Sequence, residues 1–307
     1  MPRTLQLPEE RETFALTTLD GAHFSLRVHG PGDRPRLVLS HGNGFAIDGY
    51  LPFWRHLLCD FELVLFDFRN HGRNPFHGPG GHDWPTFVED FEQILQSVQA
   101  RLGAKPTAGI FHSLSAITSL MHAVKFGWRW EALVLFEPPI LPPLSHPLRQ
   151  EARAGETRVA EWAQQRPDRF KDPEELALQW QGKPAFRNWV PGAHRLMAES
   201  ILRHDPRTGL WGLCCPRALE AKIYRENVHP ALWGQLSQLP GPVLIAGGDP
   251  TQGTGGITAK IARTIAESFG FAYAAIPNTT HLLMIEEPAR CAETAVAFLD
   301  RVGFLAA

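Results

Sequence analysis

One serine stands at the junction between an apolar segment and a helical one, a position suited to a nucleophile. Residues 108–111 are typical of a buried strand, and residues 116–126 carry a helical pattern. Ser113 lies between them, so we expect a sharp turn that presents its hydroxyl beside the backbone N–H groups of a helix N-terminus. The G-x-S-x-G pattern of such turns is incomplete, because Phe111 and Ser115 occupy the glycine positions. Helix capping by Ser113 is the structural alternative, and Ser115 is a rival nucleophile.

A serine hydroxyl needs a base to remove its proton, and His281 is the candidate base. It follows the last apolar segment, residues 271–276, which places it on a loop at the carboxyl end of a strand. Parallel strands bring such ends to one edge of a sheet, where residues distant in sequence can meet. A carboxylate that orients the imidazole should lie at the same edge. Asp249 is the preferred acid, and Glu137, which ends the segment 133–136, is the alternative.

A glycine-bearing loop indicates an oxyanion hole. The segment 41–44, His-Gly-Asn-Gly, follows the apolar run 37–39. Glycines allow backbone N–H groups to approach a developing oxyanion closely. We expect the two donors to be the backbone N–H groups of Asn43 and Leu114.

These candidates all follow short apolar runs, which are the elements that must position them. Runs of this kind are buried on both faces and alternate with helical segments, a pattern that predicts a mostly parallel sheet flanked by helices. A hairpin, formed by residues 13–18 and 22–29 around a Leu-Asp-Gly turn, precedes them. The fold class is therefore α/β. The runs are residues 37–39, 63–66, 108–111, 133–136, 243–246 and 271–276.

The strand pattern stops between residues 140 and 239. This interval contains helical stretches separated by proline and glycine, so we expect a helical cap inserted into a core formed by residues 1–139 and 240–307. Tryptophans of the cap would line an apolar substrate pocket or pack inside the cap itself. They are Trp162, Trp180, Trp189, Trp211 and Trp233.

The overall composition excludes some classes of partner. The 307 residues include 30 Lys+Arg and 32 Asp+Glu, interspersed and with a net charge of -2, so no basic patch for nucleic acid is expected. The chain has no signal-peptide pattern and no stretch of about 18 uncharged apolar residues, which predicts a cytoplasmic protein without an integral membrane segment. The four cysteines match no zinc spacing, so we expect free thiols, no metal and no cofactor.

The motifs together resemble the α/β-hydrolase superfamily over nearly the whole chain, in order and spacing. The insertion is similar to the cap of a smaller group that includes peroxisomal lipase-like and fungal toxin-biosynthesis hydrolases. Haloalkane dehalogenases and epoxide hydrolases of this fold place aspartate where this chain has Ser113, so both activities are disfavoured. The matching segments are residues 41–44, 67–74, 112–114 and 280–288 for the superfamily, and 186–189 and 213–221 for the smaller group.

These observations predict an esterase or lipase-like serine hydrolase. Ser113, deprotonated by His281, would attack the carbonyl of a small apolar ester, and water would then hydrolyse the acyl-enzyme. The same residues would also serve a lactone, thioester or carbon-carbon bond hydrolase. A non-catalytic binding protein on the same scaffold is the alternative from another class. The sequence leaves the oligomeric state open, a dimer included.

Overall fold

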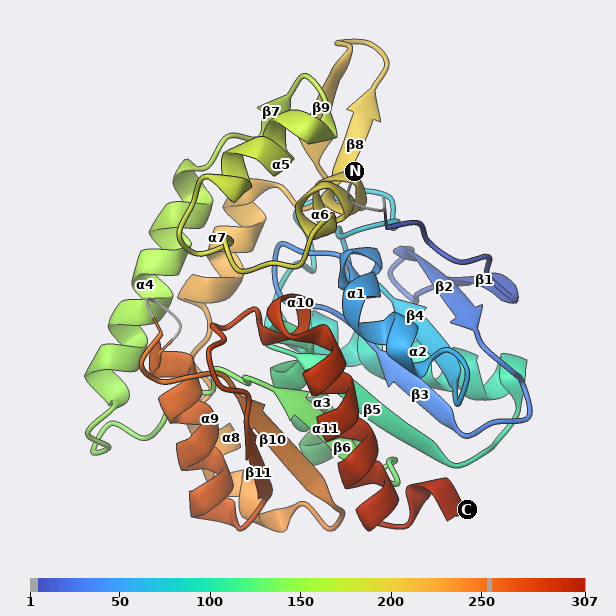
Figure 1. Ribbon diagram of the computed structural model, residues 1–307, viewed down its shortest axis with the longest axis vertical. Helices are drawn as coiled ribbons and strands as arrows, with labels where there is room; N and C mark the ends of the chain where they lie inside the picture. Colours follow the sequence, from blue (N-terminus) through green and yellow to red (C-terminus); the bar gives the residue numbers. More distant parts are fainter. Residues whose placement is uncertain (1–4, 253–255, 307) are drawn as a thin grey trace.

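The computed structural model describes residues 5–252 and 256–306, and its centre is an eight-stranded sheet (Figure 1). The strands lie in the order β1-β2-β4-β3-β5-β6-β10-β11. Only β1 and β2 run antiparallel to their neighbours, and every other pair is parallel. This confirms the predicted α/β class and the opening hairpin. The bounds are β1 Glu12–Thr17, β2 His23–His29, β3 Arg36–Leu39, β4 Glu62–Phe66, β5 Thr107–His112, β6 Leu133–Phe136, β10 Val243–Gly247 and β11 Ala272–Ala275.

Helices cover both faces of the sheet. Successive strand residues point to opposite faces, so Leu37 and Leu39 enter one buried cluster while Val38 enters the other. The first cluster lies under α1 and α11, and the second lies under α2, α3 and α9. The helices are α1 Leu51–Trp54, α2 Trp84–Leu102, α3 Leu114–Phe126, α9 Gly256–Phe269, α10 Leu283–Glu286 and α11 Pro288–Arg301, with 3-10 turns η1 Ile47–Tyr50, η2 Arg55–Leu57 and η5 Phe304–Ala306.

The insertion follows β6 and returns at β10, and it contains strands as well as helices (Figure 1). A small antiparallel sheet, β7-β9-β8, accompanies the predicted helices. Gly209, at a φ of 71°, lies in the turn between β8 and β9, where glycine adopts the left-handed conformation without strain. The elements are α4 Arg149–Gln165, β7 Arg169–Phe170, α5 Pro173–Gln181, α6 Ala193–Ile201, β8 Leu202–Asp205, β9 Leu210–Leu213, α7 Arg217–Arg225, α8 Pro230–Gln235 and η3 Leu236–Gln238.

The last part of the insertion rejoins the layer beneath the sheet. Helix α8 contacts α3, and Trp233 packs against Phe269 of α9, with ring centroids 5.5 Å apart. Trp233 therefore belongs to the core that α3 and α9 build, whereas α4 and α7 pack on each other over the carboxyl edge of the sheet. The division into core and cap at residues 140 and 239 stays a prediction.

The structure also bears on the thiols and on membrane contact. All four cysteines are free, with Cys59 exposed and Cys214, Cys215 and Cys291 buried. Within residues 5–252 and 256–306, no helix has the length and apolar character to cross a bilayer, and no group of three metal-ligating side chains gathers.

Candidate active site

Ser113 occupies a strained turn between β5 and α3. Its backbone has a φ of 53° and a ψ of -110°, a conformation that residues other than glycine rarely adopt. The Ser113 N–H donates to Phe136 O of the neighbouring strand at 3.0 Å, which fixes the turn against β6. The side chain makes no capping hydrogen bond to α3, so the alternative interpretation of Ser113 as a helix cap does not hold.

Two other residues, Gly109 and Ser115, compensate for the missing glycines of the elbow. The Phe111 ring packs against Phe91 and Trp130, with centroids 5.4 and 5.5 Å away. Gly109, on the same face of β5, leaves the space, because a Cβ there would lie 2.3 Å from Phe111 Cε2. The fully buried Ser115 closes the turn: its Oγ accepts from His112 N at 2.8 Å and donates to His112 O at 2.9 Å.

His281 lies between Ser113 and a buried glutamate. Its Nε2 is 3.0 Å from Ser113 Oγ, and its Nδ1 is 3.0 Å from Glu137 Oε2. Glu137 Oε1 accepts a hydrogen bond from Gly248 N at 2.6 Å, so both carboxylate oxygens have a partner. A carboxylate can only accept, so Nδ1 carries the imidazole proton and Nε2 is free to accept the serine proton.

The prediction that Asp249 orients His281 is wrong. Its Oδ1 accepts from the N–H and the hydroxyl of Thr251, at 2.9 and 2.7 Å, and its Oδ2 accepts from Asn278 N at 3.3 Å. These bonds hold a turn at the surface. Glu137 directly follows β6, which pairs with β5, the strand that precedes Ser113, whereas Asp249 follows β10, one strand further away. A φ of 47° at Glu137 turns the chain there, as an L-residue rarely does.

The glycine loop lies directly above the elbow. A Cβ on Gly42 would lie 3.3 Å from Ser113 Cβ and 3.0 Å from His112 Nδ1, so a side chain there would require these neighbours to shift. The backbone N–H groups of Asn43 and Leu114 have no acceptor among the described residues.

Tyr50 and His112, whose roles the sequence does not predict, connect the glycine loop, the elbow and the loop that carries His281. The hydroxyl of Tyr50 accepts from Gly42 N at 3.2 Å and lies 2.8 Å from His112 Nδ1. His112 Nε2 lies 2.8 Å from the carbonyl oxygen of His281. Since a carbonyl only accepts, Nε2–H donates to it and Nδ1 accepts from the tyrosine. Burial lowers the pKa of His112 well below its ordinary value, which keeps the ring neutral. His112 adjoins Ser113 in sequence, but no sequence signal marks Tyr50.

The loop that carries His281 is also held from its other side. The carboxylate of Glu286 accepts from Thr280 N at 2.6 Å and from Thr280 Oγ1 at 2.8 Å. The segment 67–74 supports the glycine loop in a similar way, since His71 Nε2 accepts from Gly44 N at 3.2 Å. These motifs of the sequence therefore position the loops of the site.

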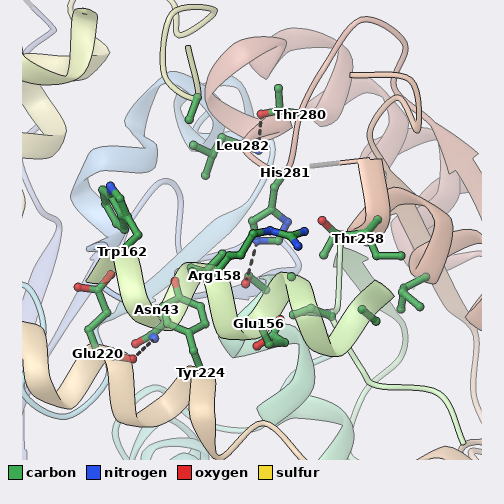
Figure 2. A pocket seen from close by; sticks show the side chains of 18 of the residues that line it. Asn43, Glu156, Arg158, Trp162, Glu220, Tyr224, Thr258, Thr280, His281 and Leu282 are labelled. Carbon is green, nitrogen blue, oxygen red and sulfur yellow. Dashed lines mark hydrogen bonds between the residues drawn. The ribbon is translucent and has the colours of Figure 1, made fainter. Parts of the chain in front are cut away.

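A cavity of about 380 Å³ adjoins Ser113 and His281 (Figure 2). Its roof comes from α4, α7 and the 183–186 segment of the insertion, and α9 closes one side. Glu156 of α4 lines it, and Asn227 Nδ2 donates to Glu156 Oε2 at 3.1 Å. Burial raises the pKa of Glu156 to about 7. The apolar side chains of the wall include Phe45, Leu141, Val159, Trp162, Phe186 and Leu282.

Comparisons with known proteins agree with this architecture. Residues 37–294 match the model of the alpha/beta hydrolase family, whereas no curated protein matches the sequence. The fold is similar to that of E-2-(acetamidomethylene)succinate hydrolase, with a TM-score of 0.75 and 19% identity over 94% of this chain and 99% of that one. A thioesterase domain from the curacin biosynthetic pathway gives a TM-score of 0.73 and 16% identity, covering 93% and 99%. A thermophilic esterase from Thermogutta terrifontis gives 0.67 and 19%, covering 95% and 99%. The chain belongs to the alpha/beta hydrolase family.

Proposed function

We propose that this protein is a serine hydrolase that cleaves carboxylic esters through an acyl-enzyme. His281 Nε2 takes the proton of Ser113 as its Oγ attacks the ester carbonyl. The tetrahedral intermediate collapses when the carbon-oxygen bond to the alcohol breaks, and the imidazolium returns the proton to the leaving alcohol. Water, deprotonated by the same imidazole, then attacks the acyl-serine, and collapse of the second intermediate releases the acid and restores the Ser113 hydroxyl.

This proposal rests on the hydrogen-bonded arrangement of Ser113, His281 and Glu137 beside an apolar cavity. The His281 nitrogens lie 3.0 Å from Ser113 Oγ and 3.0 Å from Glu137 Oε2. Both contacts fall within the hydrogen-bond reach that proton transfer requires. Glu137, held by Gly248 N–H, fixes the imidazole tautomer and stabilises the imidazolium. The backbone N–H groups of Asn43 and Leu114 would donate to the oxyanion.

Ester hydrolysis by matched variants tests the proposal. Wild type, Ser113→Ala and Ser115→Ala are assayed with p-nitrophenyl butyrate, and circular dichroism verifies that each variant is folded. We expect Ser113→Ala to lose about 10⁴-fold in kcat, because no other group supplies the nucleophile. Ser115→Ala should keep the nucleophile and lose mainly stability, since its hydroxyl closes the turn. Full activity in Ser113→Ala, or loss confined to Ser115→Ala, would contradict the assignment.

Lactones, thioesters and activated carbon-carbon bonds can be opened by the same residues, because each presents a carbonyl to the same nucleophile. A panel that pairs an ester, a thioester and a lactone of equal acyl length ranks these reactions by kcat/KM. We expect the ester to be a substrate. A folded protein that turns over no member of the panel would favour the alternative of a non-catalytic binding protein.

A further inference from the structure

Basic side chains outnumber acidic ones in the wall of the cavity. Arg158, Arg166 and Lys183 line it, together with Glu156 and Glu220. Buried or partly buried charges in an apolar cavity are normally paired, because an unpaired one loses much of its hydration. An excess of one sign in such a place therefore points to a ligand of the opposite sign.

Only one of the three basic residues has an acidic partner. Arg166 Nη2 lies 2.6 Å from Glu220 Oε2, and both side chains are almost fully buried. Half-buried Lys183 and exposed Arg158 make no ion pair with any residue of the described ranges 5–252 and 256–306, so of the two only Lys183 is partly withdrawn from water without an acidic partner. Glu156, whose pKa burial raises to about 7, carries only part of a negative charge near neutral pH. The cavity therefore keeps a net positive charge.

Two of the three basic groups lie beside one aromatic ring. Arg158, Trp162 and Arg166 are spaced four residues apart, which places them on one side of α4 and its carboxyl end. Arg166 Cζ lies 5.6 Å and Lys183 Nζ 5.5 Å from the Trp162 ring centre. A cation beside a ring is attracted to it but stays charged. Figure 2 shows Trp162 beside Glu220 on one side of the view, and the Arg158 side chain extending toward His281 and Thr258 on the other.

The geometry points to an ester whose acyl part carries a carboxylate, bound by Lys183 beside Trp162 in a cavity to whose positive charge Arg158 adds. This inference rests on the ester hydrolysis proposed above and replaces the expectation of a wholly apolar substrate. Apolar side chains such as Val159 and Leu282 would contact the methylene chain between the ester and the carboxylate.

Substrate pairs that differ only in charge test this inference. The monoethyl esters of glutaric, adipic and pimelic acid are compared with the corresponding ethyl ester amides, in which a neutral carboxamide replaces the carboxylate. Released ethanol is measured with a coupled enzyme. At the best chain length we expect kcat/KM to favour the acid by about 10- to 100-fold, the effect of a hydrogen bond to a charged group. Equal or higher kcat/KM for the amide at every length would overturn the inference.

Three variants test whether the preference for the acid over the amide arises from the basic residues of the cavity. Lys183→Met and Arg158→Met each remove one charge at similar side-chain length, and Lys171→Met removes an exposed lysine outside the cavity. We expect the acid-to-amide ratio to fall several-fold toward one in the first two variants and to stay at the wild-type value in the third. An unchanged ratio in both cavity variants would overturn the inference. Arg166 is left intact, because its loss would leave Glu220 buried without a partner.

A binding measurement separates this inference from the proposed reaction. The rate at which a fluorophosphonate labels Ser113 is measured with adipate or adipamide present, which requires no ester turnover. We expect adipate to slow the labelling at concentrations where adipamide does not, and Lys183→Met to weaken this protection. Protection without hydrolysis of any ester would refute the proposed function and support the carboxylate site. Hydrolysis of neutral esters without protection by adipate would refute the carboxylate site alone.

Discussion

Replacement of Glu137 by glutamine is the perturbation whose effect follows most directly from the structure. Gly248 N–H donates to Glu137 Oε1, so a glutamine side chain would keep its carbonyl oxygen there. Its NH₂ group would then face His281 Nδ1, which would have to accept. The proton would move to Nε2, and the imidazole could no longer take the proton of Ser113.

A wrong tautomer of this kind lowers kcat by about 10⁴-fold in serine hydrolases, which corresponds to about 5.5 kcal/mol in the activation free energy. The assay is the steady-state hydrolysis of p-nitrophenyl butyrate by Glu137→Gln. Asp249→Asn is the matched control, because Asp249 only holds a surface turn. We expect the control to stay within a few-fold of wild type. Activity of Glu137→Gln within tenfold of wild type, or a comparable loss in Asp249→Asn, would refute the reasoning.

Three further changes test groups around the site. The folded state binds the Glu156 proton more tightly than the unfolded chain, so the free energy of unfolding should fall as pH rises from about 4.5 to 7. Urea titrations at pH 5 and 8 should therefore show that Glu156→Gln gains about 1 to 3 kcal/mol in this free energy relative to wild type at the higher pH. The exposed Glu161→Gln is the control and should show no such gain. Tyr50→Phe leaves Gly42 N and His112 Nδ1 without their partner. It should lower the free energy of unfolding in urea by about 1 to 3 kcal/mol and also lower kcat. Tyr273→Phe is the control and should not affect kcat. Gly109→Ala places a methyl group against the Phe111 ring and should lower the free energy of unfolding by about 1 to 3 kcal/mol in the same assay. A wild-type free energy of unfolding in this variant would show that the ring can shift freely.

The sequence predicts the sheet and the meeting of Ser113 with His281, because each follows an apolar run at a strand end. The sequence does not determine which carboxylate contacts His281. Glu137 and Asp249 both follow apolar runs, and the choice depends on strand order and on the positive φ at Glu137, neither of which the residues reveal. The Asp249-Pro250-Thr251 turn was the available warning, since aspartate commonly accepts from backbone N–H groups two residues on.

Two other differences have local physical causes. Phe111 occupies an elbow position where glycine is expected, and Gly109, two residues earlier on the same face of β5, leaves the space for its ring. The sequence does not reveal the sheet β7-β9-β8 of the insertion, because its strands have two to four residues, too few for an alternating pattern. The roles inferred for Arg158 and Lys183 also depend on packing, since nothing in their spacing shows that they line the cavity.

The central claim is that Ser113 is the nucleophile of this site. Its most direct test is peptide mapping by mass spectrometry after the folded protein has reacted with a fluorophosphonate. We predict a single phosphonyl adduct on Ser113, absent in Ser113→Ala and strongly slowed in Glu137→Gln. An adduct on Ser115, or no adduct on a folded protein, would contradict the account.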